Sequence, residues 1–131
     1  MKPIDLMAKA EQAVSSAKVL LNVGDFDGAC GRAYYAMFNA ARAALIASGA
    51  PVAEDVSRSH SGLIAAFSLH LVKSGKFPVE LGRALNKVED LRLIADYKGE
   101  PVDPDKAAWA VEQAGSFVKA VEITFSPKPD R

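Results

Sequence analysis

Apolar residues recur at helical spacing in every stretch of this chain that lies between glycine and proline breaks. A half-buried strand would show alternating polar and apolar residues, and no convincing run of this kind occurs. The helical segments run over residues 4–22, 27–48, 57 or 59 to 74, 78–97 and 104–125. Short connections favour antiparallel neighbours. The sequence therefore predicts an all-α, up-and-down antiparallel four-helix bundle, with the third segment as a shorter additional helix.

The length of 131 residues is typical of one domain, which we expect to span the whole chain. We expect residues 4–125 to be ordered and the polar, proline-containing end, 126–131, to be frayed. Sixteen basic residues balance sixteen acidic ones, which argues against a general electrostatic nucleic-acid binder. The start of the chain lacks the apolar core of a signal peptide, and no apolar run approaches membrane-spanning length. We expect a cytoplasmic protein without a membrane partner.

The fourth predicted helix places an arginine in its apolar stripe. Arg92 lies four residues beyond Val88 and three before Ala95. Because a guanidinium keeps its charge, it needs partners wherever it is buried. Asp96 is about 40° further round the helix and can reach it, whereas Tyr97 is about 140° from it. On a solvated surface, the same arginine and aspartate would form only a weak ion pair of a few tenths of a kcal/mol.

The second predicted helix carries a polar line beside a wide apolar face. Arg32, Tyr35, Asn39 and Arg42 follow helical spacing along it. One interpretation is a solvated face. The other is the border of a cleft or a subunit contact, because Tyr35 and its neighbour Tyr34 are not both expected in the core. Trp109 in the last helix lies nearly opposite the apolar seam and is a candidate for a second contact surface.

Other side chains that could carry chemistry are few. His60 begins the apolar stripe near the start of the third predicted helix, where capping or packing is its ordinary role. His70 lies about three turns farther along, too far for the two to share a metal. The single cysteine, Cys30, sits on an alanine-rich helix and is expected to be a small core residue. The chain has no glycine-rich phosphate loop and no HExxH motif, and we predict no metal and no cofactor.

Three segments, in this order and spacing, carry a more specific signal. They are RAYYAMFNAARAAL at 32–45, SHSGLIAAFSLHLVKSGKFP at 59–78 and LRLIADY at 91–97. Together they resemble the HEPN domain family, in particular its small stand-alone prokaryotic members of the UPF0332 type, over nearly the whole chain. The resemblance implies an all-α bundle that forms a homodimer. For many relatives it implies a metal-independent endoribonuclease that acts as the toxin of a toxin–antitoxin pair, commonly encoded beside a minimal nucleotidyltransferase.

The resemblance also suggests which residues act. Active members of the family have an arginine followed four to six residues later by a histidine, paired across the dimer. Here Arg92 matches the arginine, Tyr97 occupies the histidine position and Leu93 replaces a usual polar residue. A tyrosine, with a reference pKa near 10, is a poorer general base than histidine. The predicted catalytic residues are Arg92, Tyr97, Asp96 and His60. The predicted substrate or nucleotide cleft adds Arg32, Tyr35 and Asn39.

Two other functions remain open at this point. The first is a non-catalytic module whose Arg92 cleft binds a nucleotide or phosphate, or holds a nucleotidyltransferase partner, with Tyr97 as a contact or a modification site. The second is a dimeric helical scaffold in which the Arg92–Asp96 pair only orders the end of a helix. For the ribonuclease, the RNA's own 2′-hydroxyl would attack the adjacent phosphate. Arg92 would then stabilise the developing charge, and Tyr97 or His60 would move protons.

Overall fold

The computed structural model describes residues 1–125, which contain helices and no strand. The long helices are α1 (Pro3–Asn22), α2 (Phe26–Ala47), α5 (Val79–Tyr97) and α6 (Pro104–Phe125). Shorter elements between α2 and α5 are α3 (Glu54–Arg58), α4 (His60–Phe67) and the π-helical turn η1 (Ser68–Val72). The expectation of a frayed end at 126–131 lies outside the described residues. Within residues 1–125, no helix combines the length and the apolar character that crossing a membrane requires.

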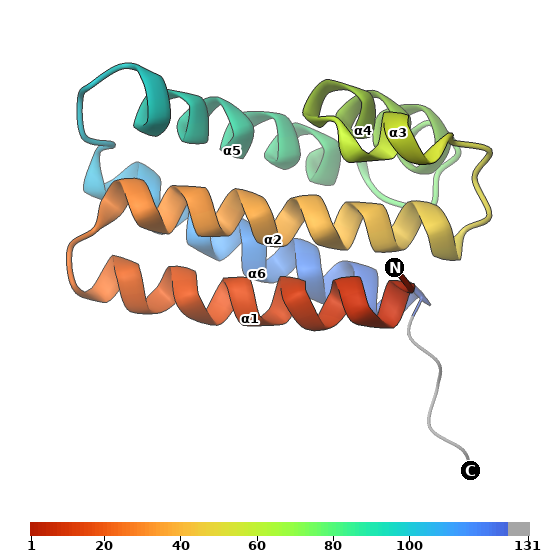
Figure 1. Ribbon diagram of the computed structural model, residues 1–131, viewed down its shortest axis with the longest axis horizontal. Coiled ribbons are helices and arrows are strands. Elements are labelled where there is room, and N and C mark those ends of the chain that lie inside the picture. The colour runs from red at the N-terminus through yellow and green to blue at the C-terminus, as the bar shows by residue number, and fades with distance from the viewer. Residues whose placement is uncertain (126–131) are drawn as a thin grey trace, which may run out of the picture.

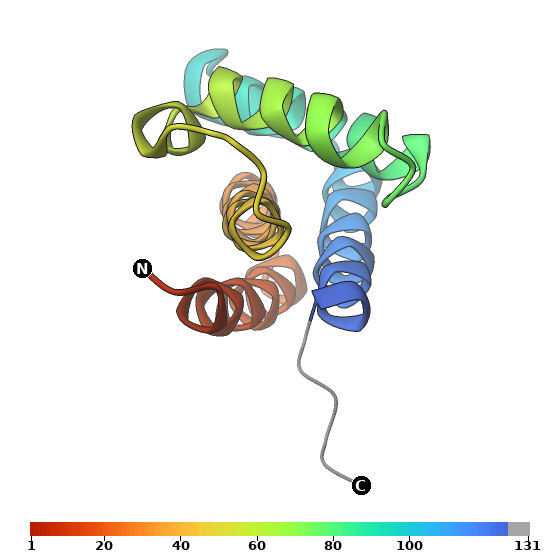
Figure 2. The same cartoon turned by 90° about the vertical axis from the view of Figure 1, so that its right-hand side faces the viewer.

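Helix α2 is the central element of the bundle. It packs along α1, α5 and α6, and it also contacts α4. The four long helices alternate in direction, so that α1 and α5 run one way and α2 and α6 the other (Figure 1). Figure 2 shows α2 nearly end-on, with α1 below it, α6 beside it and α4 crossing above it. The predicted all-α, up-and-down bundle is confirmed.

Alanine makes this central position possible. The buried alanines of α2 have side chains of one carbon, which let neighbouring helices approach closely and favour helix formation. They are Ala29, Ala33, Ala36, Ala40, Ala41, Ala43 and Ala44. Larger buried residues, Tyr34 among them, fill the remaining space, whereas Tyr35 is exposed on the polar side of the helix. The expectation that the two adjacent tyrosines are not both in the core is confirmed.

The third predicted helix is where the structure differs from the sequence-based expectation. Instead of one helix, the chain forms α3, α4 and η1. Ser59 separates the first two, because its backbone is extended and its Oγ accepts a hydrogen bond from the Gly62 amide at 3.1 Å. In η1, the Lys73 amide donates to the Ser68 carbonyl, five residues earlier. Helix α3 begins after Ala53, whose side chain cannot cap a helix, so this position carries no helix-start signal.

Two aspartates at the start of α2 have different tasks. Asp25 caps the helix, since its Oδ1 accepts a hydrogen bond from the Gly28 amide at 2.8 Å. Asp27 instead accepts a hydrogen bond from the Val102 amide at 2.8 Å. Val102 is buried in the connection between α5 and α6. Asp27 therefore fixes that connection to α2, next to the start of α6, where Asp103 caps the helix.

We expect Asp27→Ala to lower the free energy of unfolding by about 1–3 kcal/mol, because it leaves the buried Val102 amide without its acceptor. Asp27→Asn is the matched control, since its amide oxygen can still accept that hydrogen bond. Urea unfolding followed by circular dichroism measures both changes. Equal losses in the two variants would contradict the assigned role of the hydrogen bond.

Candidate functional site

A cleft of about 640 Å³ opens where α2, α5 and the segment around α3 and α4 come together. Three arginines and one histidine reach it from four different helices: Arg32 from α2, Arg58 from α3, His60 from α4 and Arg92 from α5. The remaining lining residues are Asp27, Gly28, Gly31, Tyr34, Tyr35, Phe38 and Asp96. The cleft thus combines cationic groups with aromatic rings, although the chain as a whole has no net charge.

Arg92 is held in this cleft by two carboxylates of its own helix. Its Nη1 donates to Asp96 Oδ2 at 2.9 Å, and its Nη2 lies 3.6 Å from Glu89 Oε2. The guanidinium carbon lies 5.0 Å from the centroid of the Tyr34 ring, within the range of a cation–π contact. The side chain is 15% exposed, and its buried Nε has no hydrogen-bond partner within residues 1–125. Arg92 is therefore partly rather than fully buried, and its predicted partner Asp96 is found.

His60 joins the same cluster although it lies on another helix. Its Nδ1 is 2.9 Å from the Tyr34 hydroxyl oxygen and 3.9 Å from Glu89 Oε2. The imidazole ring also packs against Phe38, with ring centroids 5.2 Å apart. Its side chain is 54% exposed, so the ring is accessible from solvent. His60 and Arg92 therefore share two neighbours, Tyr34 and Glu89. The sequence alone could not establish this.

Tyr34 keeps its proton in this environment. Burial raises the pKa of its phenol well above the ordinary value, and the nearby negative charge of Glu89 raises it further. The positive charge of Arg92 acts in the opposite direction and offsets only part of the rise in this pKa. At neutral pH the Tyr34 hydroxyl is therefore a hydrogen-bond donor as well as an acceptor.

The structure gathers some of the predicted site residues and leaves others apart. Arg32 and Tyr35 line the cleft, and the Arg32 guanidinium carbon lies 4.5 Å from the centroid of the Tyr35 ring. Asn39 is buried within α2, where its Nδ2 donates to the Tyr35 carbonyl at 3.1 Å. Tyr97 is 76% exposed at the end of α5. Neither Asn39 nor Tyr97 is among the residues that line the cleft.

Three residues of the site were not predicted from the sequence. Glu89 lies three positions before Arg92. Helical side chains meet at this spacing, so the sequence does contain a signal for the contact between Glu89 and Arg92. Tyr34 lies in an apolar stripe, and this pattern does not indicate that its hydroxyl takes part in a functional site. Arg58 lies between the two alternative starts of the third predicted helix, 57 and 59, and no pattern points to it.

Cys30 is buried in α2, as predicted. Burial raises the pKa of its thiol from 9.0 to about 11, and the negative charge of Asp27 adds to the rise. At neutral pH the thiol is therefore protonated and enclosed, which makes it a poor nucleophile.

The raised pKa of Cys30 has a consequence for stability. A folded-state pKa above the unfolded one means that the unfolded chain releases the proton first, so stability falls as pH rises from 9.0 to about 11. We expect this loss to reach about 2–3 kcal/mol for Cys30. Urea unfolding at several alkaline pH values should show a smaller decline in Cys30→Ala than in wild type, the remainder coming in part from Tyr34. Parallel declines in both proteins would contradict this.

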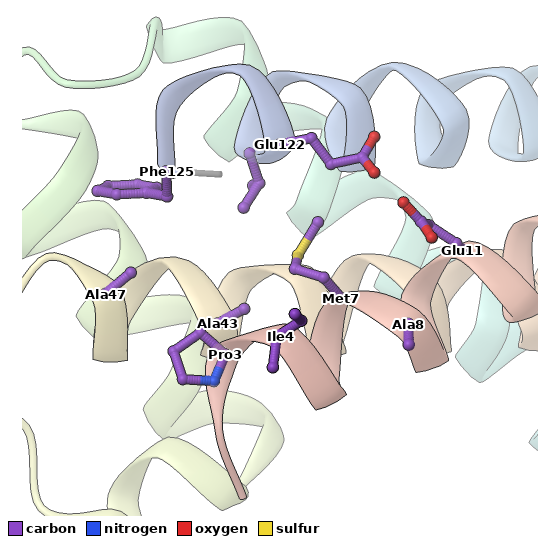
Figure 3. A pocket seen from close by; sticks show the side chains of 10 residues that line it. Pro3, Ile4, Met7, Ala8, Glu11, Ala43, Ala47, Glu122 and Phe125 are labelled. Atoms are coloured by element: carbon purple, nitrogen blue, oxygen red, sulfur yellow. The ribbon is translucent and has the colours of Figure 1, made fainter. Parts of the chain in front are cut away.

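The hollows at two other places on the bundle are lined differently from the arginine cleft. One, of about 240 Å³, lies between the start of α1 and the ends of α2 and α6, with Met7 and Phe125 among its apolar lining and the carboxylates of Glu11 and Glu122 at its rim (Figure 3). The other, of about 520 Å³, lies between α5 and α6 and includes Trp109. Within residues 1–125, no three His, Cys, Asp or Glu side chains are gathered so that they could hold a metal ion.

Comparison with known proteins identifies the family. The HEPN domain model matches residues 4–124. A UPF0332 protein of Gloeobacter violaceus is 43% identical over 95 residues, which cover 72% of this chain and 71% of that protein. A UPF0332 protein of Thermotoga maritima is 34% identical over 117 residues, 87% of this chain and 83% of that protein. "Putative toxin MJ0605" of Methanocaldococcus jannaschii is 31% identical over 117 residues, 89% and 84% of the two chains. The resemblance seen in the sequence is thus confirmed, and this chain belongs to the HEPN domain family.

Proposed function

We propose that this protein is the toxin of a toxin–antitoxin pair and that it cleaves RNA, without a metal ion, in the cleft around Arg92. The observation that carries the proposal is the convergence of three arginines and His60 on one cleft. Guanidinium groups match the geometry and charge of phosphate, and histidine exchanges protons near neutral pH. The Methanocaldococcus jannaschii relative with toxin in its name supports the proposed role as a toxin.

The reaction uses the 2′-hydroxyl of the RNA as its nucleophile. His60 accepts the hydroxyl proton, the 2′-oxygen bonds to the adjacent phosphorus, and the bond from phosphorus to the 5′-oxygen breaks. The departing 5′-oxygen takes a proton from water, and the hydroxide so formed takes the proton from His60. The products are a 2′,3′-cyclic phosphate and a 5′-hydroxyl end. Arg92 stabilises the negative charge that develops on the phosphate oxygens. Arg32 and Arg58 bind neighbouring phosphates, and Tyr35 and Phe38 offer ring surfaces to the bases.

Proton transfer is assigned to His60 rather than to Tyr97. His60 lines the cleft, whereas Tyr97 is 76% exposed and lies outside its lining. Phenols are also poorer general bases than imidazole at neutral pH. In this proposal Asp96 is a positioning residue, because its contact is with the Arg92 guanidinium.

The proposal includes a homodimer, in which two such clefts lie close together. Leu93 and Tyr97 are exposed on α5 beside the arginine site, and Trp109 lines the groove between α5 and α6. Exposed apolar side chains near one another favour a protein contact. Light scattering should give twice the 13.9 kDa mass of one chain, and a monomer at micromolar concentrations would count against the dimer.

The test of the proposed function is cleavage of a mixed RNA pool by the purified protein in EDTA. We expect shorter RNAs that end in 2′,3′-cyclic phosphates. No cleavage by a folded protein would contradict the ribonuclease function. Arg92→Ala, run in parallel, distinguishes this activity from a contaminating ribonuclease.

The second candidate is a non-catalytic nucleotide-binding or protein-interaction module that partners a minimal nucleotidyltransferase. It is favoured by the exposure of Tyr97, which a partner protein could contact or modify, and by the carboxylates that already pair with Arg92. Calorimetry with a panel of nucleotides and co-purification with the product of the neighbouring gene test it. Binding in either experiment, without RNA cleavage, would favour this candidate over the first.

A further inference from the structure

Glu89 contacts both the cation and the histidine of the cleft. Its Oε2 lies 3.6 Å from Arg92 Nη2 and 3.9 Å from His60 Nδ1. Tyr34, from α2, lies between the same groups, since its hydroxyl oxygen is 2.9 Å from His60 Nδ1 and its ring lies beneath the Arg92 guanidinium. The four side chains thus form one connected cluster, supplied by α2, α4 and α5. Glu89 and Tyr34 are not part of the ribonuclease assignment made above.

The order of the hydrogen bonds follows from what each group can donate. An ionised carboxylate only accepts, so the charge of Glu89, 3.9 Å from His60 Nδ1, favours a proton on that nitrogen. Nδ1 then donates its hydrogen bond to the Tyr34 hydroxyl oxygen, 2.9 Å away. A neutral imidazole carries one N–H, so this arrangement leaves Nε2 of His60 with a free lone pair. The reverse order would put the proton of His60 on Nε2 and turn the lone pair of Nδ1 toward the negative charge of Glu89.

The properties of Tyr34 agree with this order. Burial raises the pKa of its phenol, and the charge of Glu89 raises it further. The phenol therefore keeps its proton and stays neutral beside that carboxylate. Its oxygen remains free to accept from the imidazole at the same time.

We propose that Glu89 and Tyr34 are positioning residues that hold neutral His60 in the tautomer protonated at Nδ1, so that Nε2 is available as the base. The ring is half exposed and lines the cleft, which leaves this nitrogen accessible to RNA. The catalytic consequence rests on the ribonuclease function proposed above. The tautomer itself does not, and it can be measured in the absence of any activity.

Once His60 has taken a proton, some of the charged groups around it stabilise the imidazolium and others destabilise it. Glu89, at 3.9 Å, stabilises the imidazolium. Arg92 from α5, Arg58 from α3 and Arg32 from α2 line the same cleft and oppose it, whereas Asp27 and Asp96 partly offset these arginines. Removing the charge of Glu89 therefore leaves an excess of positive charge around the base. We expect this change to slow the proton-transfer step more than it weakens RNA binding.

Nitrogen-15 NMR of the imidazole rings tests the tautomer directly in the intact protein. The chain has two histidines, so His70 serves as an internal control and a His70→Gln variant assigns the signals. At a pH where imidazole is neutral, wild-type His60 should carry its proton on Nδ1. Tyr34→Phe keeps the ring beneath Arg92 and removes only the hydroxyl, and Glu89→Gln offers a donor as well as an acceptor. Both variants should lose the preference for this tautomer. Protonation of wild-type His60 on Nε2 would overturn the inference.

Kinetics distinguish the failure of this inference from the failure of the ribonuclease function. We expect Tyr34→Phe and Glu89→Gln to lower kcat about 10- to 100-fold with little change in KM, because they act through the base. Glu80→Gln, an exposed change on the same helix, should leave kcat unchanged. Unchanged kcat in both cluster variants would overturn the positioning role. Absence of cleavage in wild type would refute the ribonuclease function, and the NMR result would still decide the tautomer.

Discussion

Arg92→Ala should lower the rate of RNA cleavage about 100- to 1,000-fold, because it removes the group that stabilises charge on the phosphate. The fold should survive. Arg92 lies at the edge of the core, and the carboxylates of Asp96 and Glu89 that it leaves behind can be hydrated through the cleft. Initial rates on a fluorescent RNA measure the activity, and circular dichroism at increasing temperature reports on the folded state.

A matched control for this change is Arg83→Ala, which removes an exposed arginine from the same helix. It lowers the charge of the protein by the same amount but does not touch the cleft. We expect it to leave the cleavage rate within about twofold of wild type, because charges far from the phosphate are screened by salt. Cleavage that survives Arg92→Ala, or that is lost equally in both variants, would contradict the assignment of the site.

Phe67→Ala should produce the largest loss of stability, about 3–5 kcal/mol, because it creates a cavity in the core. The Phe67 side chain is fully buried at the end of α4. Its ring centroid lies 5.2 Å from that of Phe117 in α6 and 5.6 Å from that of Phe77, in the turn before α5. The three rings join α4, α6 and the turn into one cluster. Urea unfolding with circular dichroism gives the free energy of unfolding.

The control for Phe67→Ala is Leu69→Ala, two residues farther along. Leu69 is an exposed side chain of η1, so its truncation should change the free energy of unfolding by no more than about 0.5 kcal/mol. If the two changes had similar effects, the packing of the segment from α4 to η1 against the bundle would have to be reconsidered.

The long helices could be predicted because their signals are local. Helix α2 starts after Asp25 and α6 after Asp103, and both side chains accept the hydrogen bonds expected of a helix cap. Helix α3 could not be predicted in this way, because Ala53 offers no cap and the helix has only five residues. Its position therefore depends on the rest of the fold and not on a pattern within its own residues.

The candidate site likewise has one contact that helical spacing predicts and one that it does not. The contact of Arg92 with Asp96 follows from helical spacing, and the same geometry puts Tyr97 about 140° away from Arg92 on the helix, where it is exposed. The contact of Tyr34 with His60 joins residues 26 positions apart on different helices. No periodicity within either segment encodes that pair. It depends on how α4 crosses α2, and its chemistry becomes visible only in the folded chain.

In the proposed reaction, the 2′-hydroxyl of the RNA cleaves the adjacent phosphodiester in the Arg92 cleft. A short RNA that contains a mapped cleavage position, and a matched RNA with a single 2′-deoxy sugar at that position, test this reaction when both are incubated with the protein in EDTA. We expect a 2′,3′-cyclic phosphate product from the first RNA and none from the second. Cleavage of the 2′-deoxy RNA at the same position, or no cleavage of either RNA by the folded protein, would contradict it.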